Sequence, residues 1–97
     1  MVKSAPIALT TRVRLSSRFR LQWEEAQQCF VLLFPEGMIQ LNASAGEILK
    51  RCQQTTSVAT VIDDLNQSFP DADNLAADVL AFFTEAEAEG WLDSGAG

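Results

Sequence analysis

An apolar run followed by a proline–glycine turn most limits what this chain can fold into. The run Cys29–Phe34 (CFVLLF) is apolar at all six positions and contains aromatic and β-branched residues. A run of this length and composition predicts a strand that is covered on both faces. Pro35-Glu36-Gly37 follows, and because proline presets its own φ while glycine accepts a positive one, the chain reverses there. Met38–Asn42 is then the returning strand of a hairpin.

A further strand is predicted before this hairpin. Phe19, Leu21 and Trp23 alternate with polar residues, which is the period of a half-buried strand. The three strands form an antiparallel β-meander, and from residue 43 onward the apolar spacing becomes that of helices. We therefore expect an α+β fold of winged helix-turn-helix type, with a three-stranded meander followed by three α-helices.

The helix ends are marked by capping residues and breakers. Ser44 and Glu47 have the spacing of a capping box at the first helix. Pro70 ends the second helix, and the third runs to about Glu89, where Gly90 suits a left-handed stop. The remaining caps are predicted at Thr56 or Ser57 and at Asp73 or Asn74.

Charge divides the chain into a basic head and an acidic body. Five of the seven basic residues lie in the first twenty positions, whereas residues 21–97 hold two basic and 13 acidic residues, a net charge of −11. Residues 1–18 lack a clear period apart from a brief alternation at Val13 and Leu15. We expect residues 1–18 to be a flexible arm, residues 19–92 to be the folded domain and residues 93–97 to be a disordered tail.

Several function classes are disfavoured by composition. The chain has no histidine, no phosphate-binding glycine loop and no metal-ligand spacing, so we expect neither catalysis nor a cofactor or metal. Residues 71–93 contain seven acidic residues and no lysine or arginine. This negative charge disfavours binding to nucleic acid and to anionic membranes. The two cysteines lie in apolar patterns typical of reduced thiols, and no signal peptide or transmembrane run is visible. A cytoplasmic location is expected.

Peptide recognition is the class that remains. Met38–Asn42 lies at a predicted sheet edge whose free backbone groups can accept an added strand. Phe82 and Phe83 diverge by about 100° on the third helix, so that one can face the core and the other a groove. From periodicity alone, the interpretation that both are core residues is favoured.

Three sequence blocks are distinctive: Trp23–Gln27 (WEEAQ), Leu32–Met38 (LLFPEGM) and Gly90–Leu92 (GWL). Together they resemble the PqqD family of pyrroloquinoline quinone biosynthesis. The resemblance implies a non-catalytic chaperone of the precursor-peptide recognition type. Such a chaperone binds the peptide PqqA and presents it to the radical SAM enzyme PqqE, with the leader added as a strand beside the third helix.

Carried over by position, the resemblance predicts a peptide site on the returning strand and the third helix. Its residues are Met38, Ile39, Gln40, Leu41, Asn42, Leu75, Asp78, Val79 and Phe82. Asp78 is the residue most expected to steer basic leader residues. A monomer or a weak, strand-exchanged homodimer is compatible with the open edge. The alternatives are a protein–protein or regulatory module unrelated to the quinone, and direct binding of the tricarboxylate product. The last is disfavoured because no basic cluster is expected in the folded body.

Overall fold

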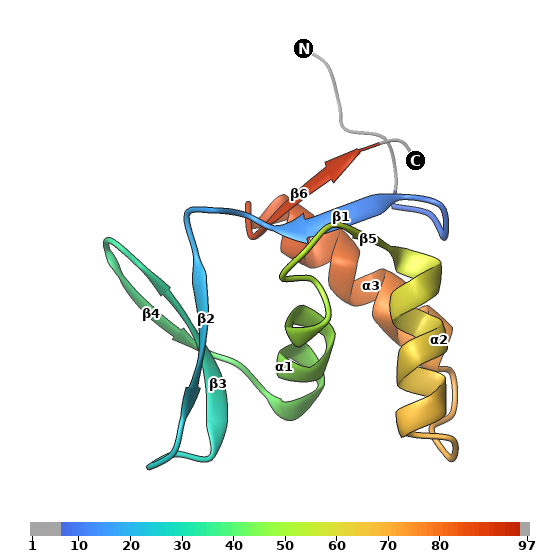
Figure 1. The fold of residues 1–97 in the computed structure, drawn as a ribbon, viewed down its shortest axis with the longest axis horizontal. Coiled ribbons are helices and arrows are strands. Elements are labelled where there is room, and N and C mark those ends of the chain that lie inside the picture. The colour runs from blue at the N-terminus through green and yellow to red at the C-terminus, as the bar shows by residue number, and fades with distance from the viewer. Residues whose placement is uncertain (1–6, 96–97) are drawn as a thin grey trace.

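The computed structural model describes residues 7–95, which form three helices and two three-stranded antiparallel sheets (Figure 1). The predicted α+β class is confirmed. The elements are, in chain order, β1 Arg12–Leu15, β2 Arg20–Glu24, β3 Cys29–Phe34, β4 Gly37–Gln40, α1 Ala43–Lys50, β5 Thr56–Ser57, α2 Val58–Ser68, α3 Leu75–Ala88 and β6 Leu92–Gly95.

The first sheet is the predicted meander, in the order β2-β3-β4. Its register pairs Leu32 of β3 with Leu21 of β2 and with Ile39 of β4. Val31 and Leu32 are neighbours on opposite faces of β3, and both are fully buried. The apolar run of β3 is thus explained by cover on both faces. In Figure 1 this sheet stands beside the three helices, not beneath them.

The second sheet was not expected, and it joins distant parts of the chain. Its order is β5-β1-β6, with β1 in the centre. Val13 faces Thr56 on one side and Ser94 on the other, and its side chain is completely buried. Residues 1–18 were predicted to be a flexible arm. This prediction is wrong for residues 12–15, because they form β1, the central strand of the sheet. Residues 1–6 lie outside the described part of the chain.

The prediction of a disordered tail over residues 93–97 is also wrong for residues 93–95, which lie in β6. Asp93 and Ser94 belong to β6, which pairs with β1 along its length, Leu92 lying opposite Leu15. Small polar residues can form such a strand because its stability comes from the backbone ladder and from Leu92, which is buried. Residues 96–97 lie outside the described part.

The helix caps partly follow the sequence prediction. Ser57 caps α2, its hydroxyl accepting a hydrogen bond from the Thr60 amide at 3.1 Å. Asn74 precedes α3 in a left-handed conformation, φ 55°, without a side-chain capping bond. After α3, Gly90 has φ 80°, and the Trp91 amide donates to the Ala86 carbonyl at 3.0 Å. This is the predicted left-handed stop, closed as a Schellman motif.

The capping box predicted at Ser44 is wrong. Asn42 is the cap of α1, its side-chain oxygen accepting from the Ala45 amide at 2.8 Å. The Glu47 carboxylate instead accepts from Arg51 at 2.8 Å, and Arg51 also pairs with Asp64. The chain enters the helix two residues earlier than the serine, so the glutamate is free to join α1 to α2 through Arg51.

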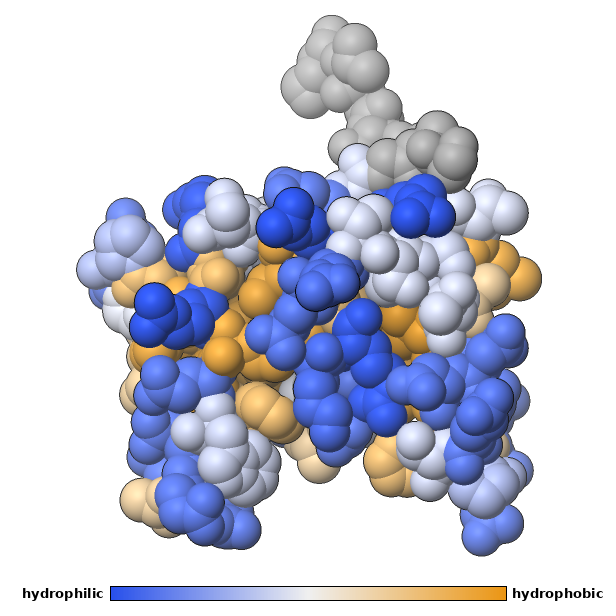
Figure 2. All heavy atoms as spheres, viewed as in Figure 1, coloured by the Kyte–Doolittle hydropathy of each residue, from blue (hydrophilic) through white to orange (hydrophobic). Residues whose placement is uncertain are grey.

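The core lies where α1, α2 and α3 meet the two sheets. Its largest fully buried side chain is Phe83 of α3, and Val13, Leu32 and Leu49 share the same apolar cluster. Figure 2 shows apolar residues across the middle of the molecule, between bands of polar residues. Among residues 7–95, no helix is long and apolar enough to cross a membrane. The core fixes how α3 stands relative to the meander, and this placement forms the candidate site.

Candidate peptide-binding site

Strand β4 forms one edge of the meander and pairs only with β3 in the described chain. The Leu41 amide donates to the Phe30 carbonyl at 2.9 Å, and the register pairs Leu32 with Ile39. In an antiparallel ladder, residues alternate between facing the partner strand and facing away. The backbone N–H and C=O groups of Met38 and Gln40 therefore point away from β3, toward the open edge, where an added strand can pair with them.

A groove of about 540 Å³ begins at the end of this strand and runs along the C-terminal half of α3. Gln40, Leu41 and Asn42 form one wall, and Phe82 is on the other. The structure thus brings together four of the nine predicted site residues. The groove is completed by Ala45, Glu85, Ala86, Ala88, Glu89 and Trp91.

The two phenylalanines of α3 have different environments. Phe83 is completely buried in the core, whereas Phe82 is partly buried and lines the groove. The centre of the Phe82 ring lies 5.9 Å from the centre of the Phe83 ring and 6.4 Å from the centre of the Trp91 ring. The favoured interpretation that both are core residues therefore holds for Phe83 and is wrong for Phe82, because the two side chains diverge around the helix. Phe82 and Trp91 form an aromatic pair that is available to an apolar ligand side chain.

Three more predicted residues lie in a second, smaller hollow. Leu75, Asp78 and Val79 line a space of about 340 Å³ between α3, α1 and Phe69 at the end of α2. Val79 is a core residue, 1% exposed, so only its edge reaches this space. Asp78 is exposed but is not among the residues that line the groove beside β4.

The remaining predicted residues have other surroundings. Met38 is half exposed and Ile39 is partly buried, and neither lines the groove or the smaller hollow. Leu41 is 5% exposed and belongs to the core. The Asn42 side chain is engaged in capping α1. The predicted strand Met38–Asn42 thus ends at Gln40, because the next two residues are used to build the core and to begin the helix.

Sequence reasoning missed Glu85, Glu89 and Trp91. The two glutamates lie three and seven residues after Phe82, so the helical period that selected Phe82 places them on the same face. Both are exposed, and they put negative charge on the rim of the groove. Trp91 follows the left-handed turn at Gly90, which directs it back toward Phe82.

Neither thiol shows features of a reactive or metal-binding group. Burial raises the pKa of Cys52 to about 12, so its thiol stays protonated and hydrogen-bonds the Ile48 carbonyl at 3.3 Å. Cys29 is partly buried and is not in a disulfide. No group of three or more potential metal ligands occurs among the residues that the structure describes.

Comparisons with known proteins agree on one family. The model of the family described as coenzyme PQQ synthesis protein D (PqqD) matches residues 29–92. The chain is 47% identical over 75 residues to the PqqA binding protein of Pseudomonas aeruginosa strain UCBPP-PA14, covering 77% of this chain and 82% of that protein. It is 38% identical over 92 residues to the PqqA binding protein of Acinetobacter baylyi, covering 95% and 92% of the two chains.

A solved structure shares the fold. The solution structure of the PqqD truncation of Methylobacterium extorquens PqqCD, described as a functional, stand-alone recognition element for ribosomally synthesised and post-translationally modified peptides, superposes with a TM-score of 0.74. It is 27% identical and covers 90% of this chain and 94% of that one. The match of the family model over most of the chain, the close relatives and the shared fold show that this chain belongs to the PqqD family.

Proposed function

We propose that this chain is a non-catalytic chaperone that binds the precursor peptide PqqA and presents it to the radical SAM enzyme PqqE. The observation that carries the proposal is the open edge of β4, which leads directly into a groove lined by Phe82 of α3. The relatives in Pseudomonas and Acinetobacter are PqqA binding proteins, which supports the same ligand here. PqqA is made on ribosomes, so the proposed place of action is the cytoplasm.

In the proposed complex, the leader of PqqA adds to β4 as a further strand. Its backbone pairs with the outward-facing groups of Met38 and Gln40, which gives affinity without reading sequence. Alternate side chains of the leader face α3 and pack on Phe82 and Trp91, which gives selectivity. A homodimer paired through the same edge excludes the peptide. In the peptide-bound chain, β4 therefore pairs with the peptide and not with a second copy of the chain.

Charge on the groove favours a basic leader. Glu85 and Glu89 lie on its rim, and Asp78 lies in the first turn of the same helix, beside the smaller hollow. Opposite charges at such a rim chiefly raise the association rate and select the partner. Holding an otherwise flexible peptide in one extended conformation then lowers the entropy cost of positioning it for the enzyme.

The experiment compares two variants at one outward-facing position, Met38→Ala and Met38→Pro. Both remove most of the side chain, but only proline removes the N–H that faces the open edge, and it leaves the ladder to β3 intact. By calorimetry with PqqA, we expect Met38→Ala to bind within about threefold of the parent and Met38→Pro to lose at least about tenfold, roughly 1.4 kcal/mol. Equal affinities for the two variants contradict strand addition at β4.

Presentation to the enzyme requires a separate measurement. We expect immobilised PqqE to retain PqqA more strongly when the chain is added, and Met38→Pro to abolish this gain. Retention of PqqA that does not depend on the chain contradicts the presentation step while leaving leader binding intact.

A further inference from the structure

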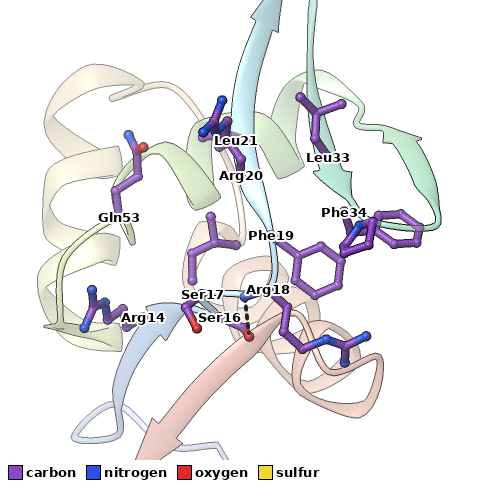
Figure 3. Close-up of a pocket in the computed structure, with 12 residues that line it drawn as sticks. Arg14, Ser16, Ser17, Arg18, Phe19, Arg20, Leu21, Leu33, Phe34 and Gln53 are labelled. Carbon is purple, nitrogen blue, oxygen red and sulfur yellow. Dashed lines mark hydrogen bonds between the residues drawn. The ribbon is translucent and has the colours of Figure 1, made fainter.

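A further hollow, similar in size to the groove beside α3, lies where the two sheets meet, on a different part of the surface (Figure 3). Its volume is about 520 Å³, and it shares no lining residue with the groove beside α3. It is formed by the end of β1, the link to β2, the start of β2, the end of β3 and Gln53. None of the residues that line it is acidic, although residues 21–97 carry a net charge of −11.

Three arginines surround this hollow: Arg14 from β1, Arg18 from the link and Arg20 from β2. Figure 3 shows their guanidinium groups at separate points around it. All three are exposed, and none forms an ion pair with another described residue. Asp93 lies opposite Arg14 in the ladder of β1 and β6, so Arg14 is the most nearly neutralised of the three.

The hollow is preformed because its backbone and its aromatic rings are held in place. The buried Ser16 accepts a hydrogen bond from the Arg18 amide at 3.3 Å through its hydroxyl, and its own amide donates to the Trp91 carbonyl at 2.8 Å. The rings of Phe19 and Phe34 lie 5.4 Å apart, and the Arg18 guanidinium lies 5.7 Å from the centre of the Phe19 ring. These contacts limit the freedom of the link, so less entropy is lost when a ligand binds.

We propose that this arginine-lined hollow docks an acidic segment of a partner protein. Guanidinium groups bind carboxylates with two parallel hydrogen bonds, and three such groups at separate points suit several carboxylates spaced along one chain. The aromatic rings between them accept an apolar side chain of the same segment. A long polyanion such as nucleic acid is repelled by the rest of the molecule, because residues 21–97 carry a net charge of −11.

We identify the partner as PqqE, and this identification rests on the proposed function. The acidic character of the docked segment does not depend on that function. The arrangement also corrects the expectation that the folded body contains no basic cluster. The three arginines belong to the region predicted to be a flexible arm or to its junction with the meander, and the formation of β1 brings them into the fold.

The test uses the full chain and a fluorescent oligoglutamate peptide as probe. The variant Arg18→Gln/Arg20→Gln removes two charges from the hollow, and the control Arg12→Gln/Lys50→Gln removes two charges from elsewhere on the surface. We expect the hollow variant to bind the probe at least about tenfold more weakly and the control to stay within about threefold. Arg14→Gln alone should have a smaller effect, because Asp93 lies beside it.

Other outcomes overturn the proposal. Equal losses in the two double variants assign the binding to overall charge, and no measurable binding by the parent chain removes the site. Citrate or a single-stranded oligonucleotide that competes as well as the peptide reassigns the hollow to a small carboxylate or to nucleic acid. Both double variants should bind PqqA as the parent does, so failure of this inference is distinguishable from failure of leader binding.

Discussion

The groove beside α3 and the arginine-lined hollow are similar in volume, about 540 and 520 Å³, but differ in charge and in origin. Glutamates of α3 stand on the rim of the first, and three arginines surround the second. The groove is built from segments that the sequence pattern identifies, the hairpin and an amphipathic helix. The hollow depends on β1, whose partners in the second sheet lie more than 40 residues away along the chain.

The two sites are nevertheless neighbours through one backbone contact. The Ser16 amide, at the hollow, donates to the carbonyl of Trp91, whose side chain lies at the groove. The domain thus carries two surfaces of opposite charge, because separate segments of the chain build each surface on one core.

The largest loss of stability is expected from Val13→Asp, which disrupts β1, the strand that supports the arginine-lined hollow. Val13 is completely buried in the central strand of the second sheet, so the variant places an unpaired charge in the core. We expect a loss of about 4 kcal/mol in the free energy of unfolding, measured by urea denaturation. The exposed neighbour provides a control, since Arg12→Gln should change stability by less than about 0.5 kcal/mol. A Val13→Asp chain as stable as the parent shows that β1 is peripheral.

Next in size is charge reversal at the groove, Glu85→Lys/Glu89→Lys. Because these carboxylates face the proposed leader, PqqA should bind about tenfold to a hundredfold more weakly at low salt, roughly 1.4–2.8 kcal/mol. The matched control reverses two exposed acids elsewhere, Asp63→Lys/Asp71→Lys, with the same change in net charge.

The control should lose far less affinity, and raising the salt concentration should reduce the difference between the two variants. An affinity that is independent of salt in the parent chain argues against electrostatic steering. It leaves strand addition to β4 and the apolar contacts of Phe82 as the source of binding.

A smaller effect is expected where α1 packs on the meander. A Cβ atom at Gly46 would lie 2.8 Å from Cδ2 of Phe30 and 3.3 Å from its Cβ, so the ring has to move. Alanine gains helix propensity but overpacks this contact, and we expect Gly46→Ala to destabilise the fold by about 1–2 kcal/mol. Ser44→Ala, an exposed change in the same helix, should leave stability unchanged or slightly raised.

This variant also separates the two sites. Ala45 of α1 lines the groove, whereas no residue of α1 lines the hollow. Gly46→Ala should therefore weaken PqqA binding more than oligoglutamate binding. Equal effects on both ligands show that the change acts through overall stability.

The sequence revealed the groove better than the hollow for a physical reason. The meander of β2, β3 and β4 has short connections and clear alternation, and the stripe containing Phe82 follows the helical period, so local patterns identify both. By contrast, β1 is four residues long, and its neighbours β5 and β6 come from remote positions that no local period reveals. Asn42, and not Ser44, caps α1 because β4 ends at Gln40. The end of that strand depends on tertiary packing, which a local pattern does not reveal.

The smallest effect concerns how stability depends on pH at the smaller hollow, which Asp78 lines. Its wall includes Glu47, whose pKa is lowered chiefly by the hydrogen bond from Arg51. A carboxylate with a lowered pKa stabilises the fold above its unfolded pKa, and this contribution is lost as the pH falls through the folded value. The parent should therefore be more stable than Glu47→Gln at neutral pH, by less than about 1 kcal/mol because the pair is partly exposed to solvent. The difference in melting temperature should shrink as the pH falls through the folded pKa of Glu47, and it should vanish in acid below that pKa. Glu36→Gln, in the exposed β3–β4 turn, provides a control that should show no such difference. A gap between parent and Glu47→Gln that persists in acid assigns the effect to packing against Arg51, which would leave the carboxylate charge with no part in joining α1 to α2.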